Sequence, residues 1–408
     1  MKEKILSFKY LDILLLFVIS IVVYLPLAHG LGYIKDDWYL MYAAHTQGPA
    51  IFHDIFAIDR PVRGVLLAML YPLFGNNPYP YSLSAWGFRL LSAISFLFLA
   101  RGVWAKQRMP TLVMAILFLV YPGYLSQVNA IDFQAHVVSL FFAILSIHLS
   151  IKAIRQESIV SRIWMSTLSV LLGWSYLALV EYAIGLEIFR ITVIAVILLR
   201  GSTKPLAEKT KALVQQAWVF FIIPVGFLFW RVFLFQNERK ATDLVAQTGQ
   251  IITSPLAALW AGVRLLQDTL NVTFLAWGVP LYDLGFQTRL REAIAGMILA
   301  LVILAVIKWL YASHLFETTE RDEDWQKEAF WLGLIVVAAT LLPVVLVNRH
   351  FTFEEYSRYG LPAAAGGIFI IVSILFSLKE KGLRAFLAYT LIFIATVTHH
   401  ANAAIAVR

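Results

Sequence analysis

The chain lacks cysteine altogether and has few charged residues for its length. With no cysteine among 408 residues, disulfide bonds, thiolate nucleophiles and zinc sites with sulfur ligands are excluded. Only 14% of the residues are charged, whereas a soluble globular chain has about 25%. A chain of this size cannot cover its surface with so few polar groups, so a soluble globular protein is excluded as well.

Apolar and aromatic residues fill the composition instead. Hydrophobic residues make up 60% of the chain, with 29 Phe, 17 Tyr and 12 Trp, and the mean hydropathy is +0.76. This composition predicts an all-α, polytopic membrane protein. The net charge of +8 does not indicate a nucleic-acid partner, because the basic residues form short clusters between apolar runs, where they act as topology signals.

The apolar runs predict about eleven transmembrane helices. A spanning helix needs about 20 mostly apolar residues, since the hydrocarbon core is about 30 Å thick. We read residues 1–408 as one transmembrane domain. The predicted spans lie near residues 10–29, 82–104, 111–126, 134–153, 162–179, 182–199, 213–235, 291–312, 329–347, 361–378 and 384–399.

The distribution of lysine and arginine predicts the orientation. The first apolar run is too long for a signal peptide and lacks a convincing cleavage site, so we expect it to be retained as a helix. With a cytoplasmic amino terminus, more than half of the 33 basic residues fall on the inner side. The loops 30–81, 236–290 and 348–360 and the carboxyl terminus are then outside, with only residues 399–408 following the last span.

This orientation gathers the polar groups capable of chemistry at the outer face. They were not used to fix the topology, so their clustering is an independent indication of function. The residues are Asp36, Asp37, Asp59, Arg60, Asp132, His136, Glu181, Arg349, His350, Glu354, Glu355 and Arg358.

Two outer loops carry structure of their own. Residues 36–45 and 61–74 have apolar residues at helical spacing and are rich in aromatic side chains, which predicts two helices lying in the membrane interface. Pro61 suits a first helical turn. In the loop 236–290, the apolar stretch 251–266 is expected to lie on or dip into the membrane, and the loop as a whole is expected to form a lid over a lipid substrate.

Four short motifs, taken in order, resemble a known superfamily. They are the acidic pair Asp36-Asp37, the Arg60-Pro61 turn, the Asn77-Pro78 step before the second span, and the late outer segment Arg358-Tyr359-Gly360-Leu361-Pro362. The chain resembles the GT-C superfamily, most closely the protein mannosyltransferase and aminoarabinose transferase type. Many members add a soluble outer domain, which is not expected in this chain.

The resemblance implies a glycosyltransferase that moves a sugar from a polyprenyl-phosphate-linked donor to a glycan, lipid or protein acceptor. It also implies catalysis at the outer face of a bacterial-type inner (plasma) membrane. The reaction needs a base for the acceptor hydroxyl, cationic groups for the departing phosphate, and carboxylates near an oxocarbenium-like transition state. The first acid of the pair matches the family's base, which gives Asp36 that catalytic role, while Asp37 orients neighbours or binds the acceptor. The alternative for the pair is a helix N-terminus that favours negative charge.

The remaining candidates are expected to bind substrate, and each has a structural alternative. Arg349 and Arg358 suit phosphate but could form salt bridges with Glu354 and Glu355, and Arg89 could extend toward lipid headgroups. Asp59 and Arg60 could pair with each other, and Glu187 and Arg190 are expected to neutralise each other within a span. No cofactor is expected, and no metal-ligand set is visible. The substrate-binding candidates are Asp59, Arg60, Arg89, Asp132, His136, Arg349, Arg358 and Tyr359.

Other classes of polytopic protein share this composition. A transporter of lipid or oligosaccharide is expected to place ionisable residues or broken helices near mid-membrane and often contains repeated halves, and no repeat is evident. An O-antigen ligase or polymerase also works at the outer face, but the acidic first loop favours the GT-C interpretation. Both remain alternatives.

Overall fold

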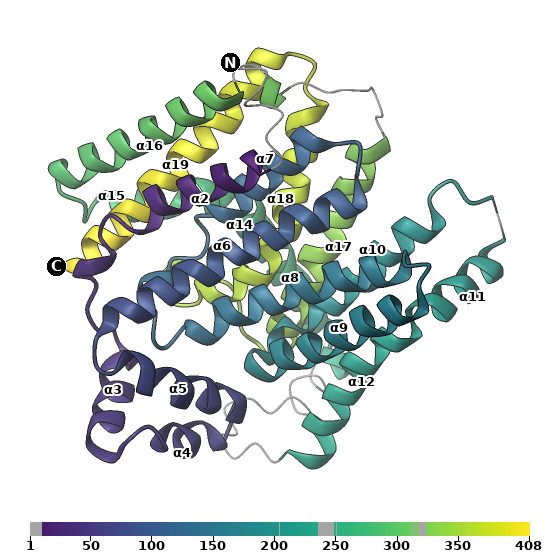
Figure 1. The fold of residues 1–408 in the computed structure, drawn as a ribbon, viewed down its shortest axis with the longest axis horizontal. Helices are drawn as coiled ribbons and strands as arrows, with labels where there is room; N and C mark the ends of the chain where they lie inside the picture. Colours follow the sequence, from purple (N-terminus) through teal and green to yellow (C-terminus); the bar gives the residue numbers. More distant parts are fainter. Residues whose placement is uncertain (1–9, 204, 236–248, 250, 312–313, 317–323) are drawn as a thin grey trace.

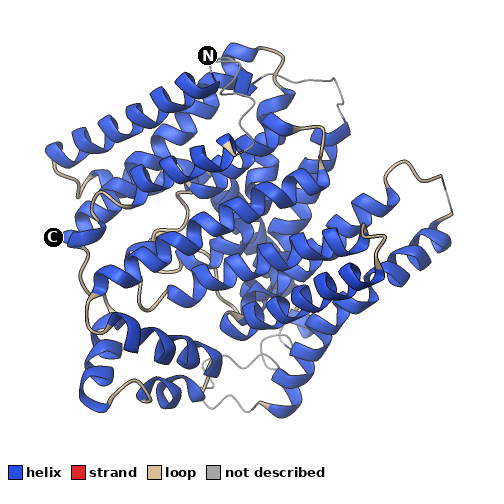
Figure 2. Cartoon of the chain, viewed as in Figure 1, coloured by secondary structure: helices blue, strands red, loops and turns tan. Residues whose placement is uncertain are grey.

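The computed structural model describes residues 10–203, 205–235, 249, 251–311, 314–316 and 324–408. Within these segments all regular structure is helical (Figure 2). The α-helices in the first half are α2 (Leu11–Tyr24), α3 (Asp36–Gln47), α4 (Ile51–Ala57), α5 (Pro61–Phe74), α6 (Pro78–Val103), α7 (Arg108–Leu119), α8 (Gln134–Ile154), α9 (Ile159–Leu179) and α10 (Gly185–Leu199). The later ones are α11 (Leu206–Ala217), α12 (Ile222–Phe229), α14 (Pro255–Thr273), α15 (Val279–Gly285), α16 (Leu290–Tyr311), α17 (Asp324–Leu346), α18 (Gly360–Ser377) and α19 (Lys381–Val407).

Short helical turns connect or extend these helices. They are η1 (Ala28–Gly30), η2 (Ser126–Val128), η3 (Glu181–Ile184), η4 (Trp218–Phe221), η5 (Trp230–Leu234), η6 (Leu275–Trp277), η7 (His314–Phe316) and η8 (Ser357–Tyr359). All are 3₁₀ turns except η5, which is a π-helix that continues α12. Such wide turns occur frequently at functional sites.

Eight helices in the described segments are long and apolar enough to cross a membrane, which supports an integral membrane protein. They coincide with eight of the eleven predicted spans. Helices also occupy the other three positions, but α2 and α7 contain only 14 and 12 residues and α9 is more polar. A 14-residue helix is about 21 Å long, shorter than the hydrocarbon core, so the number eleven stays a prediction.

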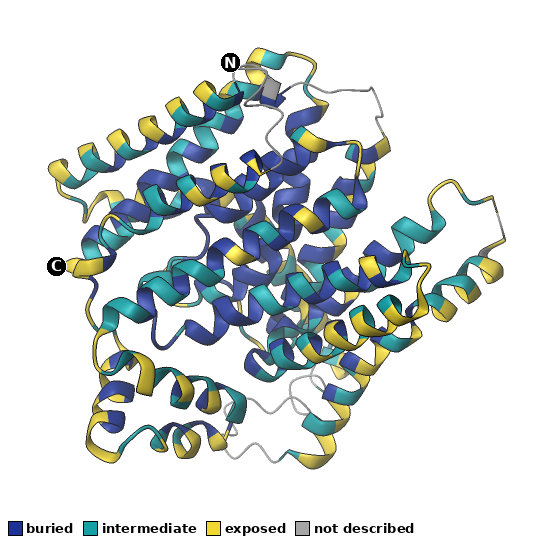
Figure 3. Ribbon diagram, viewed as in Figure 1, coloured by how far each residue is buried: buried dark blue, intermediate teal, exposed yellow. Residues whose placement is uncertain are grey.

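The core of the bundle is built from α6, α7, α8 and α18. Figure 3 shows buried residues concentrated on these central helices and exposed residues on α9, α11, α12 and α16 at the edges. Every residue of α7 from Pro110 to Leu119 is buried. Large apolar side chains such as Trp164, Phe233 and Leu301 are exposed on the peripheral helices, as expected for helices that face lipid.

The first loop folds into three helices that lie together at one end of the bundle (Figure 1). Helices α3 and α5 match the predicted pair, and α4 was missed because it is only seven residues long. Gly64 on α5 allows α4 and α5 to approach closely, since a Cβ atom there would clash with the backbone oxygen of Phe52. This end of the bundle carries the candidate catalytic residues.

One predicted boundary needs correction, and the loop 236–290 contains a packed helix. The last helix, α19, continues through Val407, so most of residues 399–408 are helical rather than following the span. In the loop 236–290, α14 packs against α17 and α18, and its Asp268, Val272 and Thr273 are buried. Residues 236–248 and 250 of that loop lie outside the described residues.

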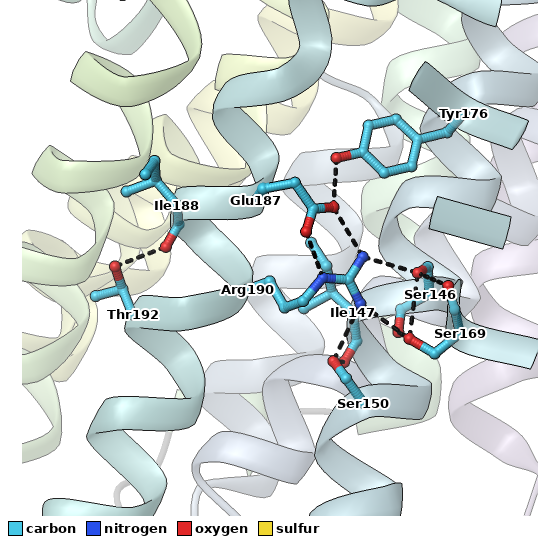
Figure 4. Close-up of polar contacts among 9 residues, drawn as sticks. All are labelled: Ser146, Ile147, Ser150, Ser169, Tyr176, Glu187, Ile188, Arg190 and Thr192. Atoms are coloured by element: carbon cyan, nitrogen blue, oxygen red, sulfur yellow. Dashed lines mark hydrogen bonds and ion pairs between the residues drawn. The ribbon is translucent and has the colours of Figure 1, made fainter. Parts of the chain in front are cut away.

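A polar cluster inside the bundle ties α8, α9 and α10 together. Arg190 donates to both carboxylate oxygens of Glu187 at 2.8 and 2.9 Å, and Tyr176 donates to Glu187 Oε1 at 2.6 Å (Figure 4). The remaining N–H groups of Arg190 donate to the hydroxyls of Ser146, Ser150 and Ser169. The prediction that Glu187 and Arg190 neutralise each other is therefore confirmed, and all five guanidinium donors are satisfied.

Candidate functional site

A cavity of about 2140 Å³ opens at the end of the bundle that carries α3, α4 and α5. It is larger than the roughly 300–1,000 Å³ of a typical small-molecule site. Of the sequence-predicted residues, the cavity is lined by Asp36, Asp59, Arg60, Asp132, His136, Arg349, Arg358 and Tyr359. The structure thus brings together residues that are more than 300 positions apart in the chain.

The two acids of the Asp36-Asp37 pair point in different directions. Asp36 is exposed and lines the cavity, whereas the side chain of Asp37 is buried, at 1% exposure. Both lie in the first turn of α3, where negative charge is favourable. Only Asp36 can therefore meet a ligand in the cavity directly.

Hydrogen bonds hold the Asp37 carboxylate from two sides. Its Oδ1 accepts from the backbone N–H of Asp132 at 2.7 Å, and its Oδ2 accepts from the backbone N–H of Ile34 at 3.2 Å. The Asn129 amide, oriented with its nitrogen toward the carboxylate, donates to both oxygens. Burial raises the pKa of Asp37 to about 7, although the two backbone N–H groups favour the charged form.

The turn that presents Asp36 has a strained backbone. Lys35 has φ +50° and ψ −117°, and the N–H of Asp37 bonds to the carbonyl of Ile34, as in a type II′ turn. That position normally requires glycine, and a residue with a side chain there costs about 1–3 kcal/mol. The hydrogen bonds of Asp37 offset this strain, and such outliers cluster at functional sites.

Asp132 and His136 line the neighbouring wall. Arg63 on α5 pairs with the carboxylate of Asp132 and also donates to its carbonyl. Asp132 lies just before α8, which begins at Gln134, so it does not share a helical face with His136 as the spacing suggested. His136 Nδ1 is buried and, within the described residues, has no hydrogen-bond partner.

Arg60 pairs with Glu181, a partner that the sequence did not suggest. Its Nε and Nη2 donate to the two oxygens of Glu181 at 2.8 and 2.7 Å. Burial lowers the pKa of Arg60, but the Glu181 carboxylate more than offsets this and raises it. On the π-helix η5, Arg231 donates to the backbone oxygen of Asp59 at 2.9 Å. These pairs join the first loop to η3 and to the end of α12.

Arg349 and Arg358 also line the cavity. Arg349 donates to the hydroxyl of Tyr359 at 2.9 Å, and Arg358 donates to the backbone oxygen of Glu355 at 3.0 Å. The Arg358 guanidinium lies 5.0–5.5 Å from the rings of Phe133, Tyr356 and Tyr359. In the described part of the chain, neither arginine has a carboxylate partner. Both are cationic groups that a ligand anion can neutralise.

Arg89 lies outside this cavity. It is buried, and its guanidinium donates to the carbonyls of Phe118, Leu119 and Tyr121 at the end of α7. These carbonyls have few helical partners because α7 stops there. In the structure Arg89 therefore holds backbone carbonyls of the chain, and its predicted contact with substrate stays a prediction.

One side of the cavity is apolar and extends along the bundle. It is formed by α10, α12 and α17, and the residues include Ile188, Ile191, Phe227, Leu228, Val232, Leu342 and Leu346. Leu228 and Val232 on this wall are largely exposed.

The cavity also contains residues that the sequence reasoning missed. They include Asn129, Tyr182, Arg231 and Asp283. Arg231 had a usable signal, because a lone arginine in an apolar run is unfavourable without a role. No cluster of three or more His, Asp or Glu that could hold a metal occurs in the described segments.

Comparisons with family models, with curated proteins and with solved structures give no match to this chain. The fold and the site define the chain as an all-helical integral membrane protein with a large cavity, charged at one end and apolar along one side.

Proposed function

We propose that this protein is a membrane glycosyltransferase that moves a sugar from a polyprenyl-phosphate-linked donor to an acceptor. One observation carries the proposal: Asp36, Arg349 and Arg358 line the same cavity as an apolar wall on which Leu228 and Val232 are largely exposed. A donor of this kind has a charged phosphate, a polar sugar and a long apolar chain. The three parts fit the three kinds of surface in the cavity.

The residues divide the reaction between them. The Asp36 carboxylate takes the proton of the acceptor hydroxyl as that oxygen forms a bond to the anomeric carbon of the sugar. The bond between that carbon and the phosphate oxygen breaks, and its electron pair leaves with the polyprenyl phosphate. Arg358 and Arg349 stabilise the negative charge that develops on the phosphate. Tyr359 holds Arg349 through its hydroxyl.

The other cavity residues support this arrangement. Asp37 positions Asp36 by fixing the turn at Lys35. Asp132, whose backbone N–H bonds to Asp37, is held by its ion pair with Arg63. Arg60 and Glu181 form an ion pair in the cavity lining, and Asp59 and His136 offer further polar contacts to the sugar. The apolar wall of α10, α12 and α17 takes the polyprenyl chain.

The proposal includes the topology. Eleven spans place the amino terminus in the cytoplasm and the cavity at the outer face of a bacterial-type inner membrane, with α2, α7 and α9 as spans beside the eight apolar ones. Helices α3 and α5 lie in the outer interface, with Trp38, Tyr39 and Tyr42 exposed on α3.

The test is release of free polyprenyl phosphate. The purified protein in lipid nanodiscs is incubated with a lipid and glycan extract of a bacterial envelope, and polyprenyl monophosphate is followed by mass spectrometry. The readout does not require the sugar to be known. Release that depends on the protein supports the proposal. Movement of the lipid-linked sugar across the membrane of proteoliposomes, without release of polyprenyl phosphate, would support the transporter alternative and overturn the glycosyltransferase proposal.

A further inference from the structure

Arg349 and Arg358, which have no carboxylate partner among the described residues, belong to one loop. Residues 347–359 connect α17 to α18, and we call this segment loop 347–359. It carries Arg349 and Arg358 into the cavity, and their contacts with Tyr359 and Glu355 are within the loop itself. What fixes the loop relative to the bundle therefore decides where the two guanidinium groups lie.

A buried carboxylate on α14 holds the middle of this loop. Asp268 is 1% exposed, and its Oδ2 accepts a hydrogen bond from the backbone N–H of Phe351 at 3.0 Å. Its Oδ1 is buried with no hydrogen-bond partner in the described residues. A buried carboxylate is costly unless it has a specific role, and here its one bond is to the loop.

A second side chain on α14 holds the start of the loop. Arg264, one helical turn before Asp268, donates to the side-chain oxygen of Asn348. Asn348 has φ +56°, a conformation that asparagine tolerates better than most residues and that ends α17. Its N–H bonds to the carbonyl of Val345, and the N–H of Arg349 bonds to that of Val344. Arg349 thus leaves α17 in a direction fixed by this turn.

Packing adds to the attachment, and near Arg358 the loop is also held by hydrogen bonds from Tyr182 to the Arg358 carbonyl and between Ser126 and Ser357. Phe351 is buried, and its ring lies edge-to-face against Phe353. It fits against Gly360 at the start of α18, where a Cβ atom would lie 2.5 Å from the ring. The glycine leaves room for the ring, and the ring keeps the Phe351 N–H directed at Asp268.

We infer that Asp268 and Arg264 are positioning residues, which act through loop 347–359 to hold Arg349 and Arg358 in the cavity. The ligand that those arginines meet rests on the proposed function, whereas the attachment of the loop does not. Arg264 lies within the segment 251–266, and the predicted role of the loop 236–290 as a lid stays a prediction.

The first test measures the loop without any substrate. The chain has no cysteine, so nitroxide labels at Glu354→Cys and Gln47→Cys report one distance between the loop and the end of α3. We expect the distance distribution to widen in Asp268→Ala and in Arg264→Gln. The matched control is Gln267→Ala, an exposed residue on the same helix, which should leave it unchanged. An unchanged distribution in both test variants overturns the inference. Arg264 is partly exposed, so Arg264→Gln keeps the test valid if Asp268→Ala fails to fold.

The second test measures binding of a polyprenyl monophosphate in nanodiscs. We expect Asp268→Ala to weaken binding about 10-fold in the parent protein and to have no further effect in the Arg349→Gln, Arg358→Gln background. A merely structural role would give additive losses, which would overturn the inference. If the labels report a wider distribution but the parent protein binds no polyprenyl phosphate, the proposed function fails while the role of α14 stands.

Discussion

The backbone N–H of Asp132 donates to Asp37 Oδ1 at 2.7 Å and joins two loops that are 95 positions apart. Through this bond the turn that presents Asp36 is fixed to the segment whose carboxylate pairs with Arg63. The exposed acid and its buried neighbour thus have separate tasks: one faces the cavity, and the other holds the backbone that places it there.

The buried carboxyl of Asp37 should make stability depend on pH. Its folded pKa of about 7 lies above the ordinary 3.8, so binding a proton favours the folded state. This contribution is complete below about pH 4 and is lost as the pH rises through 7. We expect the wild type to lose thermal stability relative to Asp37→Asn between pH 5 and pH 8, because the amide stays neutral. Parallel melting temperatures for the two proteins across this range would contradict the assignment.

The two arginines of loop 347–359 should dominate phosphate binding. Hydrogen bonds to charged groups contribute about 1.5–3 kcal/mol, so Arg358→Gln and Arg349→Gln should each weaken binding of a polyprenyl monophosphate about 10- to 100-fold. Arg291→Gln, at an exposed position on α16, is the control and should bind like the wild type. Equal affinity in the wild type and in all three variants would show that Arg349 and Arg358 do not bind the phosphate.

The apolar wall should be needed for the lipid chain. Val232 on η5 lines the cavity, and a tryptophan there should fill the wall and lower affinity for long-chain polyprenyl phosphates more than for short-chain ones. Val225 is similarly exposed on α12 but does not line the cavity, so Val225→Trp is the matched control. The measurement is the ratio of long-chain to short-chain affinity. An equal ratio in both variants would show that the polyprenyl chain does not bind along this wall.

The pair Glu187 and Arg190 should contribute to stability as a unit. Arg190→Met leaves a buried carboxylate without its cation and should cost about 3–5 kcal/mol of folding free energy. Replacing both residues, as Glu187→Leu with Arg190→Met, should recover much of that loss, because no charge is then left buried. Thermal unfolding of the variants in one lipid composition provides the comparison. If the loss of stability in the double variant equals the sum of the losses in the two single variants, this expectation is wrong.

The sequence predicted which residues gather, but not how they pair. Charge patterning between apolar runs placed Asp36, Asp132 and Arg358 at one face, since orientation follows from local composition. The partners of Asp37 and Arg60 lie 95 and 121 positions away, and such contacts depend on packing that no local pattern encodes. Arg89 resembled a surface cation because the free carbonyls at the end of α7 are invisible in sequence. Helix α4 was not predicted because seven residues give little helical periodicity.

The central claim is that Asp36 accepts the proton of the acceptor while the phosphate is held in the same cavity. The most direct measurement is release of polyprenyl phosphate by Asp36→Asn, at a donor concentration where mass spectrometry shows the variant to be as fully occupied as the wild type. The asparagine keeps the size of the side chain and removes its basicity, so we predict unchanged occupancy with release reduced at least about 100-fold, as for loss of a general base. Release at the wild-type rate from an equally occupied Asp36→Asn protein would contradict the account.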